Sequence, residues 1–338
     1  MPRLARGVDR LTTRLKIAVG AYDRTLPLMA GLIEIDDVVA EYVTAPLEEI
    51  FARAFDDQAY DITELSFSNY LYLKSTGSCP YVGLPVFPSR SFRHSAIFIR
   101  TDRGIQGPRD LAGRIVGVRE FSMTAALVAR GILEDDYGLC AADVRWRYGP
   151  AYVGDSDPIV RMIPHGIELE MLADGSNLSD ALRDGAIDAL VAYKPPPAFL
   201  NGEPNIGRLF VDYEAVEGDY ARRTGIFPIM HLLGIHREIA EHDPGLCLRV
   251  CDAFEASRRY AVERTNECQA PFTSLPWAPN EAERSRQVLG DNFWSYGVDA
   301  NRPALEALCR YSYAQGIATR PVIVDELFAP ATLSWAPS

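Results

Sequence analysis

Residues 60–70 read Tyr-Asp-Ile-Thr-Glu-Leu-Ser-Phe-Ser-Asn-Tyr, a strand pattern that runs directly into the start of a helix. The part from Tyr60 to Leu65 carries apolar and β-branched residues, which are typical of a short strand. Serine and asparagine follow at once, and their side chains suit a helix N-terminus because they accept from free backbone N–H groups. A strand followed by a helix is the repeating unit of an α/β fold.

The same alternation continues on both sides of this segment. Apolar and β-branched runs predict further strands, and apolar residues at helical spacing predict further helices. The expected strands are 15–19, 38–43, 114–118, 187–191 and 226–235. The expected helices are 26–32, 47–55, 125–133, 178–183, 245–264, 281–289 and 303–315.

The length of 338 residues favours two domains over one. We predict two lobes joined by two crossings, with residues 1–100 and 206–338 in the first lobe and 101–205 in the second. Each lobe is expected to hold a mostly parallel sheet flanked by helices. Because ligands of such sheets lie at the carboxyl ends of strands, we expect a ligand in the cleft between the lobes. The cleft would be lined by segments 22–25, 66–70, 90–94, 119–124, 193–197 and 224–231.

The charge pattern favours a small anionic ligand over nucleic acid. The chain carries a formal net charge of −12, yet Arg90, Arg93 and His94 lie together within residues 85–94, just before an apolar run. A basic cluster inside an acidic protein indicates a local anion pocket. The alternative is a solvated loop whose arginines pair with surface acids.

The remaining composition is that of a folded protein outside the membrane. The chain is 48% hydrophobic and 24% charged, which argues against disorder, and no apolar run is long enough to span a bilayer. No secretory signal is recognised at the N-terminus, and none of the six cysteines forms a C-x-x-C pair. We therefore expect reduced thiols and a cytoplasmic location.

Metal binding is not supported by local spacing. The five histidines form no H-x-H or H-E-x-x-H pattern, and no histidine lies at ligand spacing from the cysteines Cys247 and Cys251. We expect no metal, although a divalent ion held by residues distant in sequence stays open.

Several segments together resemble the 4,5-dihydroxyphthalate decarboxylase family. The matching stretches are 60–70, 85–94, 117–126, 130–133, 224–231, 275–277, 301–302 and 315–316. The resemblance runs from about residue 15 to 328. It implies a two-lobed fold like that of type 2 periplasmic binding proteins. It also implies a carboxy-lyase that converts 4,5-dihydroxyphthalate to protocatechuate and CO2 in phthalate degradation, with no cofactor.

The implied substrate sets three chemical demands. It carries two adjacent carboxylates, and each has a phenolic hydroxyl para to it. Electron push from that hydroxyl loads the ring carbon that bears the carboxylate, a proton adds to this carbon, and loss of CO2 restores aromaticity. The site therefore needs cations for the carboxylates, a group that polarises the hydroxyl, and a proton donor near the ring face.

Arginines are the expected carboxylate ligands because the guanidinium fork matches a carboxylate. The candidates are Arg93 and Arg119, followed by Arg90 and Arg24. Salt bridges at the surface or between the lobes are the alternative. Neutral donors are expected at two facing helix N-termini, with helix N-capping as the alternative. These donors are Ser66, Ser68, Asn69 and Thr124.

Proton transfer is assigned to His231 and His94, because histidine titrates near neutral pH. One histidine would accept the phenol proton and the other would donate to the ring carbon, and the order stays open. Histidines satisfied within the core are the alternative. Glu64 and Glu120 are candidates for engaging the hydroxyls.

A less polar wall is expected beside the carboxylate that leaves, because this group becomes neutral CO2. Core packing is the alternative role for the aromatic residues concerned. They are Phe67, Phe92, Phe121 and Phe227.

Other functions on the same fold stay open. One is a solute-binding protein for a small aromatic or dicarboxylate ligand, and another is an enzyme acting on a different substrate, such as a menaquinone or thiamine precursor. A sensor domain would need a helix-turn-helix segment, for which residues 1–14 are too short. The C-terminal aromatic residues, among them Trp294 and Tyr313, pack on the first lobe or form a subunit contact, so a homo-oligomer is one alternative.

Overall fold

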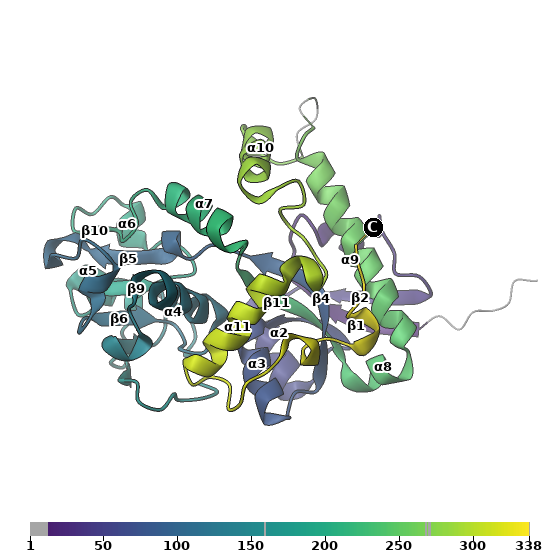
Figure 1. The fold of residues 1–338 in the computed structure, drawn as a ribbon, viewed down its shortest axis with the longest axis horizontal. Coiled ribbons are helices and arrows are strands. Elements are labelled where there is room, and N and C mark those ends of the chain that lie inside the picture. Colours follow the sequence, from purple (N-terminus) through teal and green to yellow (C-terminus); the bar gives the residue numbers. More distant parts are fainter. Residues whose placement is uncertain (1–12, 159, 268, 270–271, 338) are drawn as a thin grey trace, which may run out of the picture.

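The computed structural model describes residues 13–158, 160–267, 269 and 272–337. These residues form two α/β lobes, each built around one mixed sheet with helices against it (Figure 1). The two-lobed architecture predicted from the alternating sequence pattern is confirmed.

The first sheet has the strand order β2-β1-β3-β11-β4. Strand β1 pairs in parallel with β2 and β3, whereas β11 runs antiparallel to both β3 and β4. The returning strand β11 therefore makes this sheet mixed. The strands are Thr13–Ala18 (β1), Val38–Val43 (β2), Ile62–Ser66 (β3), Tyr81–Arg90 (β4) and Ile229–His236 (β11).

The second sheet has the order β10-β5-β9-β6-β7-β8. The pairs β9–β6, β6–β7 and β7–β8 are parallel, and β5 is antiparallel to β9 and β10. The strands are Ile97–Arg100 (β5), Ile115–Val118 (β6), Arg145–Tyr148 (β7), Leu169–Met171 (β8), Ala189–Val191 (β9) and Ile206–Arg208 (β10).

The crossings between the lobes lie slightly outside the expected boundaries of 101 and 205. Both crossing strands, β5 and β10, pair inside the second sheet, because β5 bonds β9 on one side and β10 on the other. The chain thus leaves the first lobe between β4 and β5, and it returns through the segment between β10 and β11.

Most expected helices begin or end within a few residues of the expected positions, and the helix expected at 26–32 is shorter. The helices are Leu26–Met29 (α1), Leu47–Asp57 (α2), Phe67–Thr76 (α3), Thr124–Tyr137 (α4), Leu178–Asp184 (α5), Pro197–Leu200 (α6), Tyr213–Thr224 (α7), Arg237–His242 (α8), Pro244–Arg264 (α9), Ala278–Leu289 (α10) and Arg302–Ala314 (α11).

Helix α11 joins the lobes behind the cleft. It contacts α3 of the first lobe and α4 of the second, and it crosses between the two lobes in Figure 1. Gln315, just after α11, accepts a hydrogen bond of 2.7 Å from Arg130 on α4. Tyr311 packs where any side chain at Gly131 would collide with its ring, so the two helices approach closely. The C-terminal helix therefore fixes α4 against the first lobe.

The remaining features concern membrane crossing and cysteine state. No helix among the described residues has the length and apolar character needed to cross a bilayer. The five cysteines among the described residues are free thiols, and the sixth cysteine of the sequence, Cys268, lies outside the described residues.

Candidate active site

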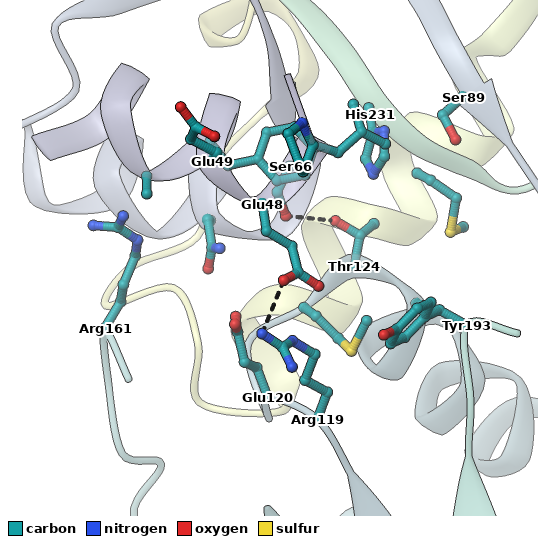
Figure 2. A pocket seen from close by; sticks show the side chains of 18 of the residues that line it. Glu48, Glu49, Ser66, Ser89, Arg119, Glu120, Thr124, Arg161, Tyr193 and His231 are labelled. Carbon is teal, nitrogen blue, oxygen red and sulfur yellow. Dashed lines mark hydrogen bonds and ion pairs between the residues drawn. The ribbon is translucent and has the colours of Figure 1, made fainter. Parts of the chain in front are cut away.

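A cavity of about 540 Å³ lies between the lobes. Helix α2, the starts of α3 and α4, and strand β11 all contribute to its walls (Figure 2). Five of the six segments expected to line the cleft supply residues to it, and the exception is segment 22–25. The cavity between the lobes that the sequence predicted is therefore present, and its wall carries both polar and apolar side chains.

His231 enters the cavity from strand β11 of the first lobe (Figure 2). The pairing of β11 with β4 shifts register on both sides of His231, an irregularity of the kind that re-aims a side chain near a functional site. Its Nδ1 lies 2.6 Å from Glu64 Oε1, and its ring meets the edge of Phe51 at 4.9 Å between centroids. The imidazole is thus held from behind and flanked by an aromatic ring.

Glu64 is completely buried behind this histidine. Burial alone would raise the pKa of the Glu64 carboxyl, but the hydrogen bond and charge of His231 outweigh it, helped by donors from Gly20 and Tyr22, so the pKa is lowered. Glu64 is therefore ionised and acts as an acceptor for its neighbours.

Arg93 is the cavity arginine that lacks an acidic partner. It is 8% exposed, and its Nε–H donates to Met230 Sδ at 3.2 Å, but it makes no ion pair with any described residue. Burial lowers the pKa of Arg93 to about 10, an effect that the charge of Glu217 partly offsets. A buried cation without a counterion is costly, which favours an anionic ligand at this place.

Two helix N-termini face each other in the middle of the cavity wall. Ser66 Oγ lies 3.1 Å from Thr124 Oγ1, and the backbone N–H of Ser68 donates to the same Thr124 oxygen at 3.0 Å (Figure 2). Thr124 thus caps helix α3 from the opposite lobe, whereas Ser66 makes no capping bond of its own. The Oδ1 of Asn69 is buried without a partner among the described residues.

The second-lobe wall carries arginines that are already paired. Arg119 donates to Glu48 on α2 at 2.9 Å and to Asp155 at 3.3 Å, and Arg161 pairs with Asp56 at the end of α2 at 2.7 Å. Figure 2 shows the Glu48–Arg119 pair crossing the cavity from one lobe to the other. Both arginines therefore connect the second lobe to helix α2.

The less polar part of the wall is made by residues other than those expected. Phe51, Met123 and Met230 line the cavity with leucine and alanine side chains. Of the aromatic residues expected there, none lines it. Phe67 and Phe121 are buried in the core, and Phe92 stacks on Phe227 at 4.8 Å between centroids.

His94 does not reach the cavity, so the prediction that it transfers a proton to the substrate is wrong. It is 1% exposed and packs against the rings of Phe210 and Tyr220. Neither ring nitrogen has a hydrogen-bond partner among the described residues. Burial lowers the pKa of His94 to about 4, so this histidine is a neutral core residue.

Arg90 and Arg24 are also absent from the cavity wall, contrary to expectation. Arg90 is buried and donates to the carbonyl oxygens of Phe227 at 2.8 Å and Ser295 at 2.6 Å, and to Asn301 Oδ1. Arg24 Nε donates to the Pro88 carbonyl oxygen at 2.6 Å. Both guanidinium groups hold backbone segments in place.

The other residues expected at the site differ in whether their side chains line the cavity. Glu120 lines the cavity, whereas Ser68 contributes only its backbone N–H near Thr124, and its hydroxyl is buried without a partner among the described residues. The expected residues that line the cavity are Ser66, Asn69, Arg93, Arg119, Glu120, Thr124 and His231.

Residue-level reasoning missed Glu48, Phe51 and Arg161. Glu48 lies in the first turn of α2, where acidic residues are common for helix stability alone, so its type gave no separate signal. Phe51 matched the apolar spacing of the same helix. Arg161 lies outside any helix or strand, where sequence periodicity carries no information.

No group of three or more His, Cys, Asp or Glu side chains within the described ranges is arranged to hold a metal ion. Among the polar groups that line the cavity, the guanidinium, hydroxyl and imidazole groups can donate hydrogen bonds to an organic anion, whereas the carboxylates can accept them from hydroxyl groups.

Comparison with known proteins identifies the family. A 4,5-dihydroxyphthalate decarboxylase from Comamonas testosteroni is 38% identical over 325 residues, which cover 95% of this chain and 97% of the relative. This chain belongs to the 4,5-dihydroxyphthalate decarboxylase family. A second member, from Pseudomonas putida, is 41% identical over 209 residues, covering 62% of this chain and 81% of the relative. No family model matches the sequence.

Solved structures of other proteins share the fold of this decarboxylase-family chain. The periplasmic aliphatic sulphonate binding protein SsuA from Escherichia coli aligns with a TM-score of 0.53 at 13% identity, over 96% of this chain and 92% of SsuA. A mutant of DszB solved with biphenyl-2-sulfinic acid aligns with a TM-score of 0.53 at 16% identity, over 95% and 98%. The periplasmic-binding-protein-like fold is therefore shared.

Proposed function

We propose that this chain catalyses the non-oxidative decarboxylation of 4,5-dihydroxyphthalate to protocatechuate and CO2. The observation that carries the proposal is the polarity of the cavity. Arg93, which makes no ion pair with a described residue, contacts Met230, the residue before His231. The carboxylates of Glu48 and Glu120 lie together away from His231 (Figure 2). A substrate with carboxylates on one side of its ring and hydroxyl donors on the opposite side matches this arrangement.

In this orientation Arg93 binds the carboxylate that is retained. The hydroxyl of Thr124 and the start of helix α3 add donors suited to an anion. The carboxylate that leaves lies against Phe51, where a neutral product is favoured over a charged group. Binding is thus strongest for the carboxylate whose charge persists through the reaction.

His231 supplies the proton to the ring carbon. Electron density from the para hydroxyl, which donates a hydrogen bond to Glu48 or Glu120, loads that carbon. The carbon–hydrogen bond forms with the proton of Nε2, the carbon–carbon bond to the carboxylate then breaks, and its electron pair restores the aromatic ring. Solvent returns the proton to the imidazole, so one proton is consumed for each CO2 released.

The test is turnover of the purified protein with 4,5-dihydroxyphthalate, followed by chromatography and absorbance, with and without a chelator. We expect protocatechuate to form at the same rate in both samples. Loss of activity with the chelator would keep the reaction and introduce a metal. Tight binding of the compound without product would contradict the proposal and favour a solute-binding role, which the fold also supports in other proteins.

A further inference from the structure

We propose that Glu64 and Tyr22 form a buried support that fixes which nitrogen of His231 carries a proton and where the ring points. The catalytic meaning of this support rests on the proposed function. Neither Glu64 nor Tyr22 lines the cavity, so both are positioning residues that act through His231.

Both carboxylate oxygens of Glu64 accept hydrogen bonds from the protein. Its Oε1 receives His231 Nδ1 at 2.6 Å and the Tyr22 hydroxyl at 2.8 Å, and its Oε2 receives the Gly20 N–H at 2.8 Å. Because an ionised carboxylate only accepts hydrogen bonds, Nδ1 of His231 must carry hydrogen. Nε2 is then the nitrogen left for the cavity, and it both gives and regains the proton while Nδ1 stays bound.

Tyr22 holds the carboxylate from the other side. Burial, together with the neighbouring charge of Glu64, raises the pKa of the Tyr22 hydroxyl above its usual range, so this hydroxyl stays a donor. An added Cβ at Gly20 would lie 2.5 Å from the Tyr22 ring, a collision with a side chain that is fixed in place. Glycine at this position therefore lets the tyrosine reach Glu64.

Arg24 supports the tyrosine in turn. Its guanidinium carbon lies 4.2 Å from the centroid of the Tyr22 ring and 4.1 Å from that of Trp294. Such cation–π contacts restrict the ring between two neighbours. Arg24, which the sequence suggested as a substrate ligand, thus does not contact the cavity. It supports His231 indirectly, through Tyr22 and Glu64.

The kinetic test replaces Glu64 by glutamine. An amide places an NH2 group opposite one of three donors, so at least one hydrogen bond is lost and the ring is no longer fixed. For Glu64→Gln we expect kcat to fall about 10²–10⁴-fold, whereas KM changes less than about threefold. Tyr22→Phe keeps two of the three bonds, and we expect a fall in kcat of about 3–10-fold.

The matched control is Glu255→Gln. Glu255 is also buried and paired, with Arg258, but it lies on α9 away from the cavity. We expect it to lose stability and keep kcat. Wild-type kcat in Glu64→Gln, or equal losses of kcat in Glu64→Gln and Glu255→Gln, would overturn the proposal.

The direct test is ¹⁵N NMR of the ring nitrogens in histidine-labelled protein without substrate, with the His231 signals assigned from their absence in His231→Gln. At a pH where the ring is neutral, we expect hydrogen on Nδ1 in the wild type and in Tyr22→Phe, because the Glu64 carboxylate still accepts from Nδ1 in both. In Glu64→Gln we expect a shift towards hydrogen on Nε2. Hydrogen on Nε2 in the wild type would overturn the proposal. This measurement needs no turnover, so an inactive wild type would refute the proposed reaction while the NMR result still decides the role of Glu64.

Discussion

The arginines on the two walls of the cavity differ in whether they form ion pairs. On the first-lobe wall Arg93 is buried and makes no ion pair with any described residue, whereas on the second-lobe wall Arg119 and Arg161 are both paired with acids of helix α2. Paired charges satisfy each other and hold two lobes in one arrangement. A buried charge without a partner costs stability, and such a cost is expected where the partner is a ligand.

Among the variants that compare the two cavity walls, the largest effect is expected for Arg93→Met. Removing the cation that binds the retained carboxylate should lower kcat/KM about 10²–10³-fold, because a buried charge pair with the substrate is lost. The same change removes an uncompensated buried charge, so the free energy of unfolding should equal or exceed that of the wild type. Steady-state kinetics and urea unfolding measure the two quantities. A destabilised variant with normal kcat/KM would make Arg93 a structural residue.

His94 offers a contrast to Arg93, its neighbour in the chain, because a buried histidine can lose its charge. Burial holds the pKa of His94 at about 4 in the folded protein, below about 6.5 in the unfolded chain. The unfolded state therefore binds more protons between these values, and stability falls as the pH drops from about 6.5 to about 4. Over this range His94 should account for about 2–3 kcal/mol of the loss.

Urea unfolding of the wild type and His94→Phe at pH values above and below this window measures that contribution. The variant should lose less stability on acidification than the wild type does, and its kcat at neutral pH should stay within about threefold of the wild type. Equal acid sensitivity in both proteins would show that His94 is already charged or solvated in the folded state.

The fold could be predicted from the sequence because apolar spacing reports directly on strands and helices. Strand β2 begins and ends at the expected residues, Val38 and Val43, and helix α9 begins one residue before the expected position. The direction of the returning strand β11 could not be predicted, because strand pairing depends on tertiary contacts and not on local pattern.

The site could be predicted only in part, because neighbouring residues point in different directions. Arg93 lines the cavity, but Arg90, three residues earlier, and His94, one residue later, point into the protein. The residue types alone do not show which of these three side chains points into the cavity. Glu48 and Arg161 lie more than one hundred residues apart in sequence, and only the folding of the two lobes brings them to the same cavity.

Arg119→Met tests the role of the paired arginines on the second-lobe wall. This change leaves Glu48 and Asp155 without their cation, and since Glu48 is half exposed the cost should be about 1–2 kcal/mol of stability. We expect kcat/KM to fall about tenfold as the lobes lose one connection. Thermal unfolding and kinetics measure both. A loss of activity as large as that of Arg93→Met, without a loss of stability, would place the substrate carboxylate on Arg119 instead.

The smallest effect is expected for Asp56→Asn. The Arg161–Asp56 pair is partly exposed, and such pairs contribute about 0.2–1 kcal/mol. We expect kcat/KM within about threefold of the wild type, with the difference shrinking at high salt because ions screen an exposed pair. A series of assays at rising ionic strength measures this. If the difference in kcat/KM between Asp56→Asn and the wild type grew with salt, Arg161 would have a role in addition to its ion pair with Asp56.

In this account His231 donates the proton and Arg93 binds the substrate. The variant His231→Gln tests this division of roles most directly. Binding of 4,5-dihydroxyphthalate, measured by isothermal titration calorimetry, should stay within about threefold of the wild type because Arg93 is intact. Formation of protocatechuate in the same samples should fall about 10²–10⁴-fold. Turnover near the wild-type rate would contradict the claim and remove His231 from the reaction.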